Sequence, residues 1–254
     1  MEISFLIGNS IEDIVTSVKK TKIGFAGIAR KEWLKKNLEN KNTDPNLSSK
    51  LIRRKKGIET ILIQTNNKVQ KVLSLDEIYV FIIPTSDKFV TQNMNGVLGY
   101  SPYKNTIHLY VNPDIHFRDE LEKTFIHEYN HAYFHTKRNW KSLLDSLIAE
   151  GLAEVFSDEI TKYKQRSKWT NVLTDIERVD YWLKLKNQLD NENLHSSVFF
   201  ARNDEFPIWT GYDIGYNIVN LFRQKYLNLS WEELMNKTPD DILILSEFDN
   251  KYSK

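Results

Sequence analysis

The chain has no cysteine among its 254 residues, and this absence excludes both disulfide bonds and thiolate metal ligands. It also has almost no excess charge of one sign, because 35 basic and 34 acidic side chains leave a formal net charge of +1. A balanced charge provides no general attraction to nucleic acid or to an anionic membrane. Binding partners must therefore be sought in a local group of residues.

No stretch of the sequence approaches the roughly 18 consecutive apolar residues of a membrane-spanning helix. The amino terminus, Met1-Glu-Ile-Ser-Phe-Leu-Ile-Gly8, has an acid where a secretory signal would have Lys or Arg, and its apolar run is too short for a signal peptide. We therefore expect a cytoplasmic protein without a membrane partner. Apolar residues at 41% and charged residues at 27% are typical of a globular protein with a sizeable core.

The order of the expected elements indicates an α+β fold. They are helices over 10–20 and 26–38, a loop over 40–49, strands over 78–83, 95–100 and 106–111, and then helices over 167–190, 210–226 and 230–236. We expect one catalytic unit over 1–254 with two approximate lobes, 1–141 and 142–254.

A run of four basic residues, Arg53-Arg-Lys-Lys56, invites a nucleic-acid-binding interpretation. No aromatic residues alternate with the basic ones, and the overall charge is balanced. We therefore expect a solvated helix face and no nucleic-acid partner.

The most informative segment is His127-Glu-Tyr-Asn-His131, within a stretch, 118–138, that contains neither Gly nor Pro. Apolar side chains recur at helical spacing on the side opposite the two histidines, namely Leu121, Phe125, Tyr129, Ala132 and Tyr133. Histidines one helical turn apart lie on one face, about 6 Å apart, which suits two ligands of one zinc ion. Glu128 lies beside that face, where its carboxylate can act as the general base toward an attacking water.

A catalytic zinc site usually has three protein ligands, so the two histidines need a partner. His135 repeats the spacing, but on a straight helix it lies about 12 Å from His127, so we expect it to support a ligand or lie on the surface. The metzincin arrangement would require Gly and His at the positions of Phe134 and Lys137. That arrangement is excluded by the sequence.

Glu150 is the better third ligand, because a second helix is expected over 142–160 and a Glu on it can complete a site of two His and one Glu. Glu154, one turn later, has two interpretations: a hydrogen bond to the far nitrogen of His127 or His131, or an ordinary solvated residue. The residues that could start this helix are Ser142, Asp145 and Ser146.

The HExxH motif with a Glu on the next helix resembles the gluzincin pattern of zinc peptidases, and the 18 residues between His131 and Glu150 match its aminopeptidase-type version. Three segments resemble the bacterial YjaZ-like family of predicted zinc-dependent proteases. They are His127-Glu-Tyr-Asn-His131, Leu143-Leu-Asp-Ser-Leu-Ile-Ala-Glu-Gly-Leu-Ala-Glu154 and Trp209-Thr-Gly-Tyr-Asp-Ile-Gly-Tyr-Asn-Ile-Val219. The likeness covers about residues 27 to 230, and its specific motifs lie between 120 and 220.

The resemblance implies a zincin-like metalloprotease fold, in which a small mixed sheet precedes the active-site helix and a mainly helical C-terminal lobe follows. It also implies that His127, His131 and Glu150 bind Zn²⁺ and that Glu128 is the general base. The resemblance does not supply a particular substrate, and for a metallopeptidase we expect a peptide or protein.

The gluzincin likeness further suggests an oxyanion-binding residue. Tyr212 and Tyr216 lie four residues apart, about as far beyond Glu150 as the tyrosine that binds the oxyanion in aminopeptidase-type gluzincins. Either tyrosine can instead be a core residue. We favour Tyr212, with His195 as a weaker substitute or a loop histidine without a role.

In zincins the sheet lies above the site, and its edge strand pairs with an extended peptide substrate. Asn95-Gly-Val-Leu-Gly99 is our candidate for this edge, since glycine permits close backbone approach. A plain hairpin or bulge explains the two glycines equally well.

We therefore expect a zinc metallopeptidase. Two alternatives are a zinc-binding domain that acts as a non-catalytic binding or regulatory protein, and a hydrolase of a non-peptide amide. The presence of Glu128, which a pure binder does not need, favours an enzyme.

Overall fold

The computed structural model describes residues 1–6, 45–162, 166–201 and 204–253. The chain divides into two compact units, Met1–Tyr133 and Phe134–Lys254. The helices expected over 10–20 and 26–38 lie outside the described residues, as does the 40–44 part of the expected loop.

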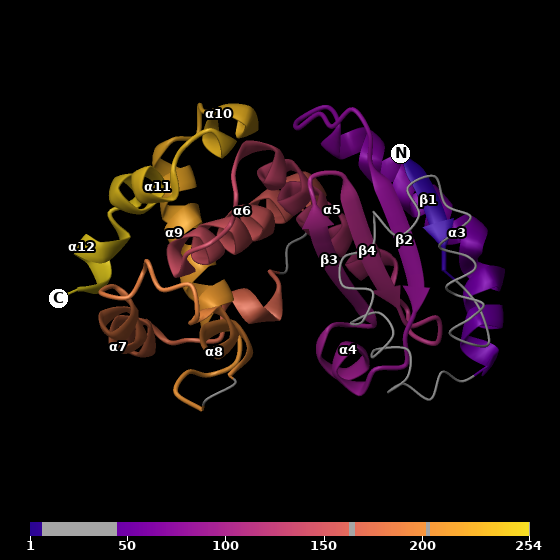
Figure 1. Ribbon diagram of the computed structural model, residues 1–254, viewed down its shortest axis with the longest axis horizontal. Coiled ribbons are helices and arrows are strands. Elements are labelled where there is room, and N and C mark those ends of the chain that lie inside the picture. The colour runs from indigo at the N-terminus through magenta and orange to yellow at the C-terminus, as the bar shows by residue number, and fades with distance from the viewer. Residues whose placement is uncertain (7–44, 163–165, 202–203, 254) are drawn as a thin grey trace. The chain divides into compact units, whose positions relative to one another are not determined.

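The first unit is built on a small mixed sheet (Figure 1). Its strands are β1 (Glu2–Phe5), β2 (Tyr79–Pro84), β3 (Val97–Tyr103) and β4 (Thr106–Val111). Within the described residues their order is β1-β2-β4-β3. The pairs β1–β2 and β2–β4 are parallel, whereas β3 runs antiparallel to β4. Helices α3 (Pro45–Val69) and α4 (Lys88–Asn93) belong to this unit, and α5 (Arg118–Lys137) begins in it.

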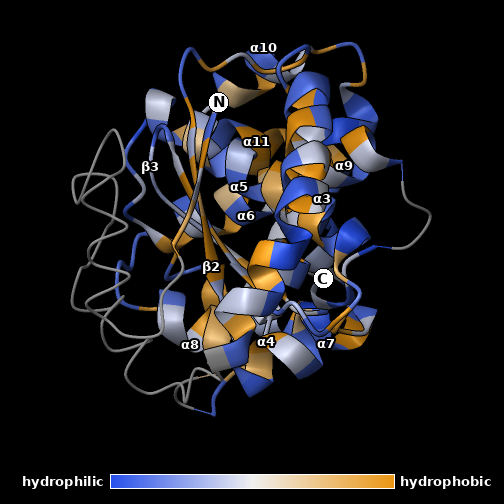
Figure 2. Cartoon of the chain, turned by 90° about the vertical axis from the view of Figure 1, so that its right-hand side faces the viewer, coloured by the Kyte–Doolittle hydropathy of each residue, from blue (hydrophilic) through white to orange (hydrophobic). Residues whose placement is uncertain are grey.

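The three strands predicted over 78–111 are confirmed, and β4 begins and ends at the predicted residues. Every residue of β2 and β4 is buried, as expected for central strands that are covered on both faces. Figure 2 shows β2 in the colour of hydrophobic residues. Strand β3 lies at an end of the described sheet, which confirms its prediction as an edge strand.

The loop predicted over 40–49 is wrong for its second half, because α3 begins at Pro45. Proline is favoured in the first turn of a helix, where its fixed φ fits and its missing N–H has no partner to lose. Arg53, Arg54, Lys55 and Lys56 are all exposed on α3, which confirms the solvated helix face. Hydrophilic and hydrophobic residues alternate along this helix in Figure 2.

The helix that carries the two histidines is confirmed as α5. Tyr129, which lies between these histidines, anchors it to the rest of the unit. Tyr129 is fully buried, and its hydroxyl donates to the carbonyl oxygen of Leu73 (2.9 Å) and accepts from the backbone N–H of Leu75 (3.1 Å). These bonds attach the segment before β2 to the helix. Burial raises the pKa of the Tyr129 hydroxyl, so it stays protonated and able to donate.

Replacing Tyr129 with Phe is therefore expected to destabilise the protein without changing the histidines. Losing both hydrogen bonds to buried backbone should cost about 1–3 kcal/mol. Thermal denaturation should show a Tm lower by about 2–4 °C for each kcal/mol. Tyr103→Phe, on a side chain that is 44% exposed, is the matched control and should leave Tm unchanged. Equal effects of the two substitutions would contradict the anchoring role.

The second unit is helical in its described residues. Its elements are α6 (Leu143–Thr161), a short 3₁₀ helix η2 (Lys168–Thr170), α7 (Asp175–Leu185), α8 (His195–Phe200), α9 (Thr210–Lys225), α10 (Trp231–Met235), α11 (Pro239–Ser246) and α12 (Phe248–Tyr252). The predicted helices over 142–160, 210–226 and 230–236 are confirmed as α6, α9 and α10. Ser142 is the N-cap of α6 and forms a capping box with Asp145, so these residues do start the helix. With the mixed sheet, these helices make the α+β fold that the sequence predicts.

The single helix predicted over 167–190 is wrong, because it is divided into η2 and α7. Asp213, fully buried on α9, accepts the backbone N–H groups of Val172 (2.8 Å) and Leu173 (3.0 Å). It also binds the Arg178 guanidinium at 2.7 Å. The N–H groups of Val172 and Leu173 donate to Asp213 and therefore cannot form hydrogen bonds within a helix. Helical periodicity in the sequence could not reveal this interruption between η2 and α7.

Candidate metal centre

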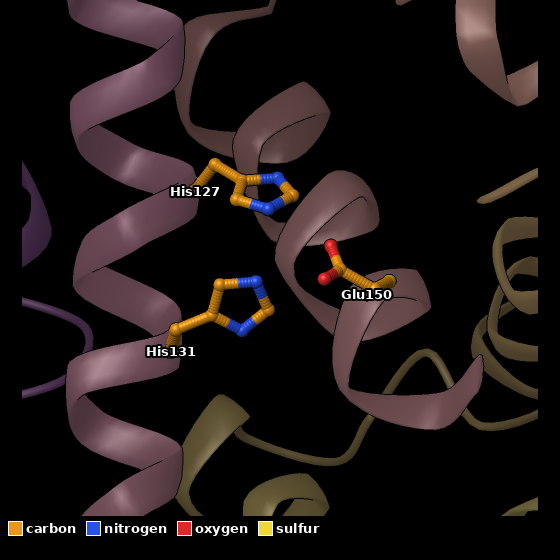
Figure 3. A group of neighbouring side chains, drawn as sticks. All are labelled: His127, His131 and Glu150. Atoms are coloured by element: carbon orange, nitrogen blue, oxygen red, sulfur yellow. The ribbon is translucent and has the colours of Figure 1, made fainter. Parts of the chain in front are cut away.

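Two elements provide the candidate ligands: α5 carries His127 and His131, and α6 carries Glu150. The ligand atoms that these three side chains offer all lie within 4.8 Å of one another. The two imidazole centroids are 4.6 Å apart. Figure 3 shows both rings and the carboxylate pointing toward one another. The structure thus brings together the three residues that the sequence predicted as zinc ligands.

The donor set fits a zinc ion. Zinc binds imidazole nitrogen and carboxylate oxygen at about 2.0–2.2 Å, and a tetrahedral centre therefore needs donors about 3.4 Å apart. The donor atoms of the three side chains lie within 4.8 Å of one another, which is close to this spacing. His131 and Glu150 are buried, at 4% and 6% exposure, and His127 is half-buried. A buried carboxylate beside two imidazoles is typical of a metal site.

Close packing of α6 on α9 fixes the backbone that carries Glu150. An added Cβ on Gly151, the next residue, would lie 2.2 Å from the carbonyl oxygen of Gly215 on α9. One on Gly215 would lie 2.2 Å from the carbonyl oxygen of Leu147. Only glycine at both positions lets the two helix backbones approach this closely, so α9 determines where this turn of α6 lies.

Glu128, the predicted general base, is outside the group of three donors and is 6% exposed. Its side chain lies against the backbone of β3 at Gly99, where an added Cβ would be 2.4 Å from both Cγ and Oε1 of Glu128. The structure thus brings Glu128 close to the backbone at Gly99, and the approach of a substrate to this strand stays a prediction. Gly96, in contrast, has a φ of +82° in the turn between α4 and β3, so its backbone conformation is the reason for glycine there.

Glu154 is 2% exposed, so its interpretation as a solvated residue is wrong. Its two carboxylate oxygens accept hydrogen bonds from the hydroxyl of Ser167 and the indole N–H of Trp169, both at 2.7 Å. These bonds attach the η2 segment to α6. A further bond from Glu154 to His127 or His131 stays a prediction.

The two candidate oxyanion donors on α9 have different surroundings. Tyr216 is 4% exposed, and its hydroxyl donates to Asp158 Oδ2 at 3.1 Å. Burial raises the pKa of Tyr216, the negative charge of Asp158 raises it further, and the Arg166 guanidinium opposes both. Tyr212 is half-buried, and its ring meets the edge of the Phe199 ring at 5.2 Å.

Two further histidines, His135 and His195, lie among aromatic rings of the second unit. His195 is the first residue of α8 and stacks on Phe199 at 4.5 Å, so the loop interpretation is wrong. The His135 ring lies 6.0 Å from that of Trp140, and His135 is not part of the group that could hold a metal. The His195 ring also lies 6.5 Å from that of Trp140. No sequence pattern indicated this aromatic cluster, because its members come from α5, α8 and the segment between α5 and α6.

Residues 58–244 match a family model described as "Predicted Zn-dependent protease (DUF2268)". The chain belongs to this family. Among curated proteins, it is similar to the "Uncharacterized protein YjfC" of Bacillus subtilis (strain 168), with 24% identity over 151 residues. That alignment covers 53% of this chain and 50% of YjfC, so the chain spans about half the length of this relative. No solved structure matches the chain.

The family confirms the resemblance to predicted zinc-dependent proteases, and it agrees with Zn²⁺ as the cofactor of the His127, His131 and Glu150 group. Every helix in the described part of the chain is too short or too polar to span a lipid bilayer.

Proposed function

We propose that the protein is a cytoplasmic zinc metallopeptidase that hydrolyses peptide bonds in peptide or protein substrates. The observation that carries the proposal is the group of two imidazoles and one carboxylate with a further buried glutamate, Glu128, next to the first histidine. A purely structural zinc site is closed by four protein ligands, whereas three ligands leave a position for water or substrate.

Each of these side chains has a separate role in the proposed reaction. When bound, zinc supplies a Lewis acid that polarises the substrate carbonyl and lowers the pKa of a water molecule. Glu128 accepts the proton of the attacking water and returns it to the nitrogen of the leaving amine. His127, His131 and Glu150 hold the cofactor, and burial of Glu150 and His131 keeps bulk water from competing for it.

Strand β3 is the proposed binding edge for an extended substrate. Among the described strands it pairs only with β4, so a peptide can add to its other side through main-chain hydrogen bonds. Glu128 lies against this strand at Gly99, which would place a bound peptide bond close to the base.

Tyr212 is the proposed oxyanion donor, because the hydroxyl of Tyr216 already donates to Asp158. Tyr212→Phe is expected to lower kcat about 100-fold, the typical effect of losing one oxyanion donor, with little change in Tm. Tyr216→Phe, on the same face of α9, should instead lower Tm and leave kcat within a few-fold. Steady-state kinetics and thermal denaturation of both variants would check this, and the reverse pattern would assign the role to Tyr216.

The proposed function is tested by incubating the purified protein with a diverse peptide library, with and without a chelator. We expect cleavage that the chelator abolishes and that added zinc restores. If no peptide is cleaved in any condition while zinc stays bound, the protein is a zinc-binding domain without peptidase activity. If the protein hydrolyses only non-peptide amides, the zinc-dependent mechanism stands and the proposed substrate class is wrong.

A further inference from the structure

The contact between Gly99 and Glu128 involves the stem of the glutamate as well as its tip. The three atoms nearest to an added Cβ on Gly99 are Cγ at 2.4 Å, Oε1 at 2.4 Å and Cδ at 2.6 Å, all from Glu128. Non-bonded carbon atoms normally lie about 3.5–4.0 Å apart. The side chain of Glu128 therefore occupies the space that the Cβ of any other residue at position 99 would need.

Backbone conformation is not the reason for glycine at position 99. Gly96 is the glycine with a positive φ among the described residues, whereas Gly99 lies in regular pairing with Leu109 of β4. The three atoms nearest to an added Cβ all belong to Glu128, so this side chain is the reason for glycine here. To remove the overlap, Cγ of Glu128 would have to move, which requires a different χ1 rotamer. The side chain is 6% exposed, so it has little space for such a change. Such a change carries the carboxylate several ångströms away.

We propose that Gly99 is the positioning residue of Glu128. Its missing Cβ lets the carboxylate lie directly against the edge strand, and any side chain at position 99 turns the carboxylate away from it. The structural part of this proposal concerns only Gly99 and Glu128, and its catalytic part rests on the proposed peptidase function.

A double-mutant cycle tests the structural part without any activity measurement. Gly99→Ala alone is expected to lower Tm by about 3–8 °C, because the added methyl overpacks against Glu128. In the Glu128→Ala background, which lacks Cγ, Cδ and Oε1, the same substitution should change Tm by less than about 2 °C. If Gly99→Ala alone does not fold, a double variant that does fold shows the same coupling between Gly99 and Glu128.

Two further measurements test the catalytic part. Gly99→Ala should keep the zinc content of the parent, measured by elemental analysis, and should lower kcat about 100-fold with a much smaller change in KM. Gly57→Ala is the matched control, because Gly57 is exposed on α3 and an added Cβ there meets nothing within 4 Å. It should leave kcat and zinc content unchanged and show no coupling to Glu128→Ala.

The outcomes separate this proposal from the proposed function. If the parent cleaves no peptide but the cycle shows coupling, the peptidase function fails and the positioning of Glu128 by Gly99 stands. If the parent is active and Gly99→Ala keeps its kcat, the positioning role is overturned. Equal Tm losses in both backgrounds, or a double variant that also fails to fold, overturn it as well.

Discussion

Replacing Glu128 with glutamine is expected to abolish peptide hydrolysis while leaving zinc bound. Glutamine keeps the shape of the side chain but cannot accept a proton from the attacking water, so kcat should fall by about 10²–10⁴-fold. Because Glu128 is not one of the three donors, the zinc content should remain that of the parent. Steady-state kinetics on a cleaved peptide and elemental analysis of the same sample measure the two quantities together.

Glu232→Gln is the matched control, since Glu232 is an exposed residue of α10. It should leave kcat unchanged. A Glu128→Gln variant that cleaves peptides as fast as the parent would show that the base has been assigned to the wrong residue. A variant that loses its zinc would place Glu128 among the ligands instead.

Replacing Glu150 with alanine is expected to remove the metal. Protein purified without added metal should contain about one zinc per chain, and the variant should retain less than about a tenth of that content. Two imidazoles alone form an incomplete site, and the affinity lost with a ligand exceeds the roughly 10–100-fold effect of losing a supporting residue. Since bound zinc stabilises the folded state, the difference in Tm with and without chelator should also disappear in this variant.

Two further variants show whether zinc is lost because a ligand is missing or because packing is disturbed. Glu150→Gln keeps the volume of a buried side chain but is a weaker ligand, so zinc loss here separates coordination from packing. His135→Ala, one turn beyond His131 and outside the donor group, should keep its zinc. A zinc content near that of the parent in both Glu150 variants would refute the proposed site and, with it, the metallopeptidase function.

The elements that the sequence predicted well are those with a strong local pattern. Strand β4 matches its prediction because a short run of strand-forming residues lies between turn residues, and helix α5 matches because neither Gly nor Pro interrupts it. The capping box of Ser142 and Asp145 is likewise a local signal. The same holds for the ligand spacing, because the geometry of one helix determines that His127 and His131 share a face.

The errors arose where distant residues decide the local structure. Asp213 binds the backbone between η2 and α7, and no pattern near residue 172 indicates this bond. Short helices such as α4, α8, α11 and α12 were not predicted, since a helix of one or two turns has too few residues to show a period. The burial of Glu154 also depends on Ser167 and Trp169, which follow it by more than ten positions.

The sequence by itself determined the α+β class through the order of its expected helices and strands. It also determined, through residue spacing along two helices, that His127, Glu128 and His131 share one helix and that Glu150 on the next is their candidate partner. Only the tertiary structure decided that Tyr216 is bonded to Asp158 and that Gly99 makes room for Glu128. Both depend on side chains from separate elements meeting in space, and local periodicity carries no information about which side chains meet.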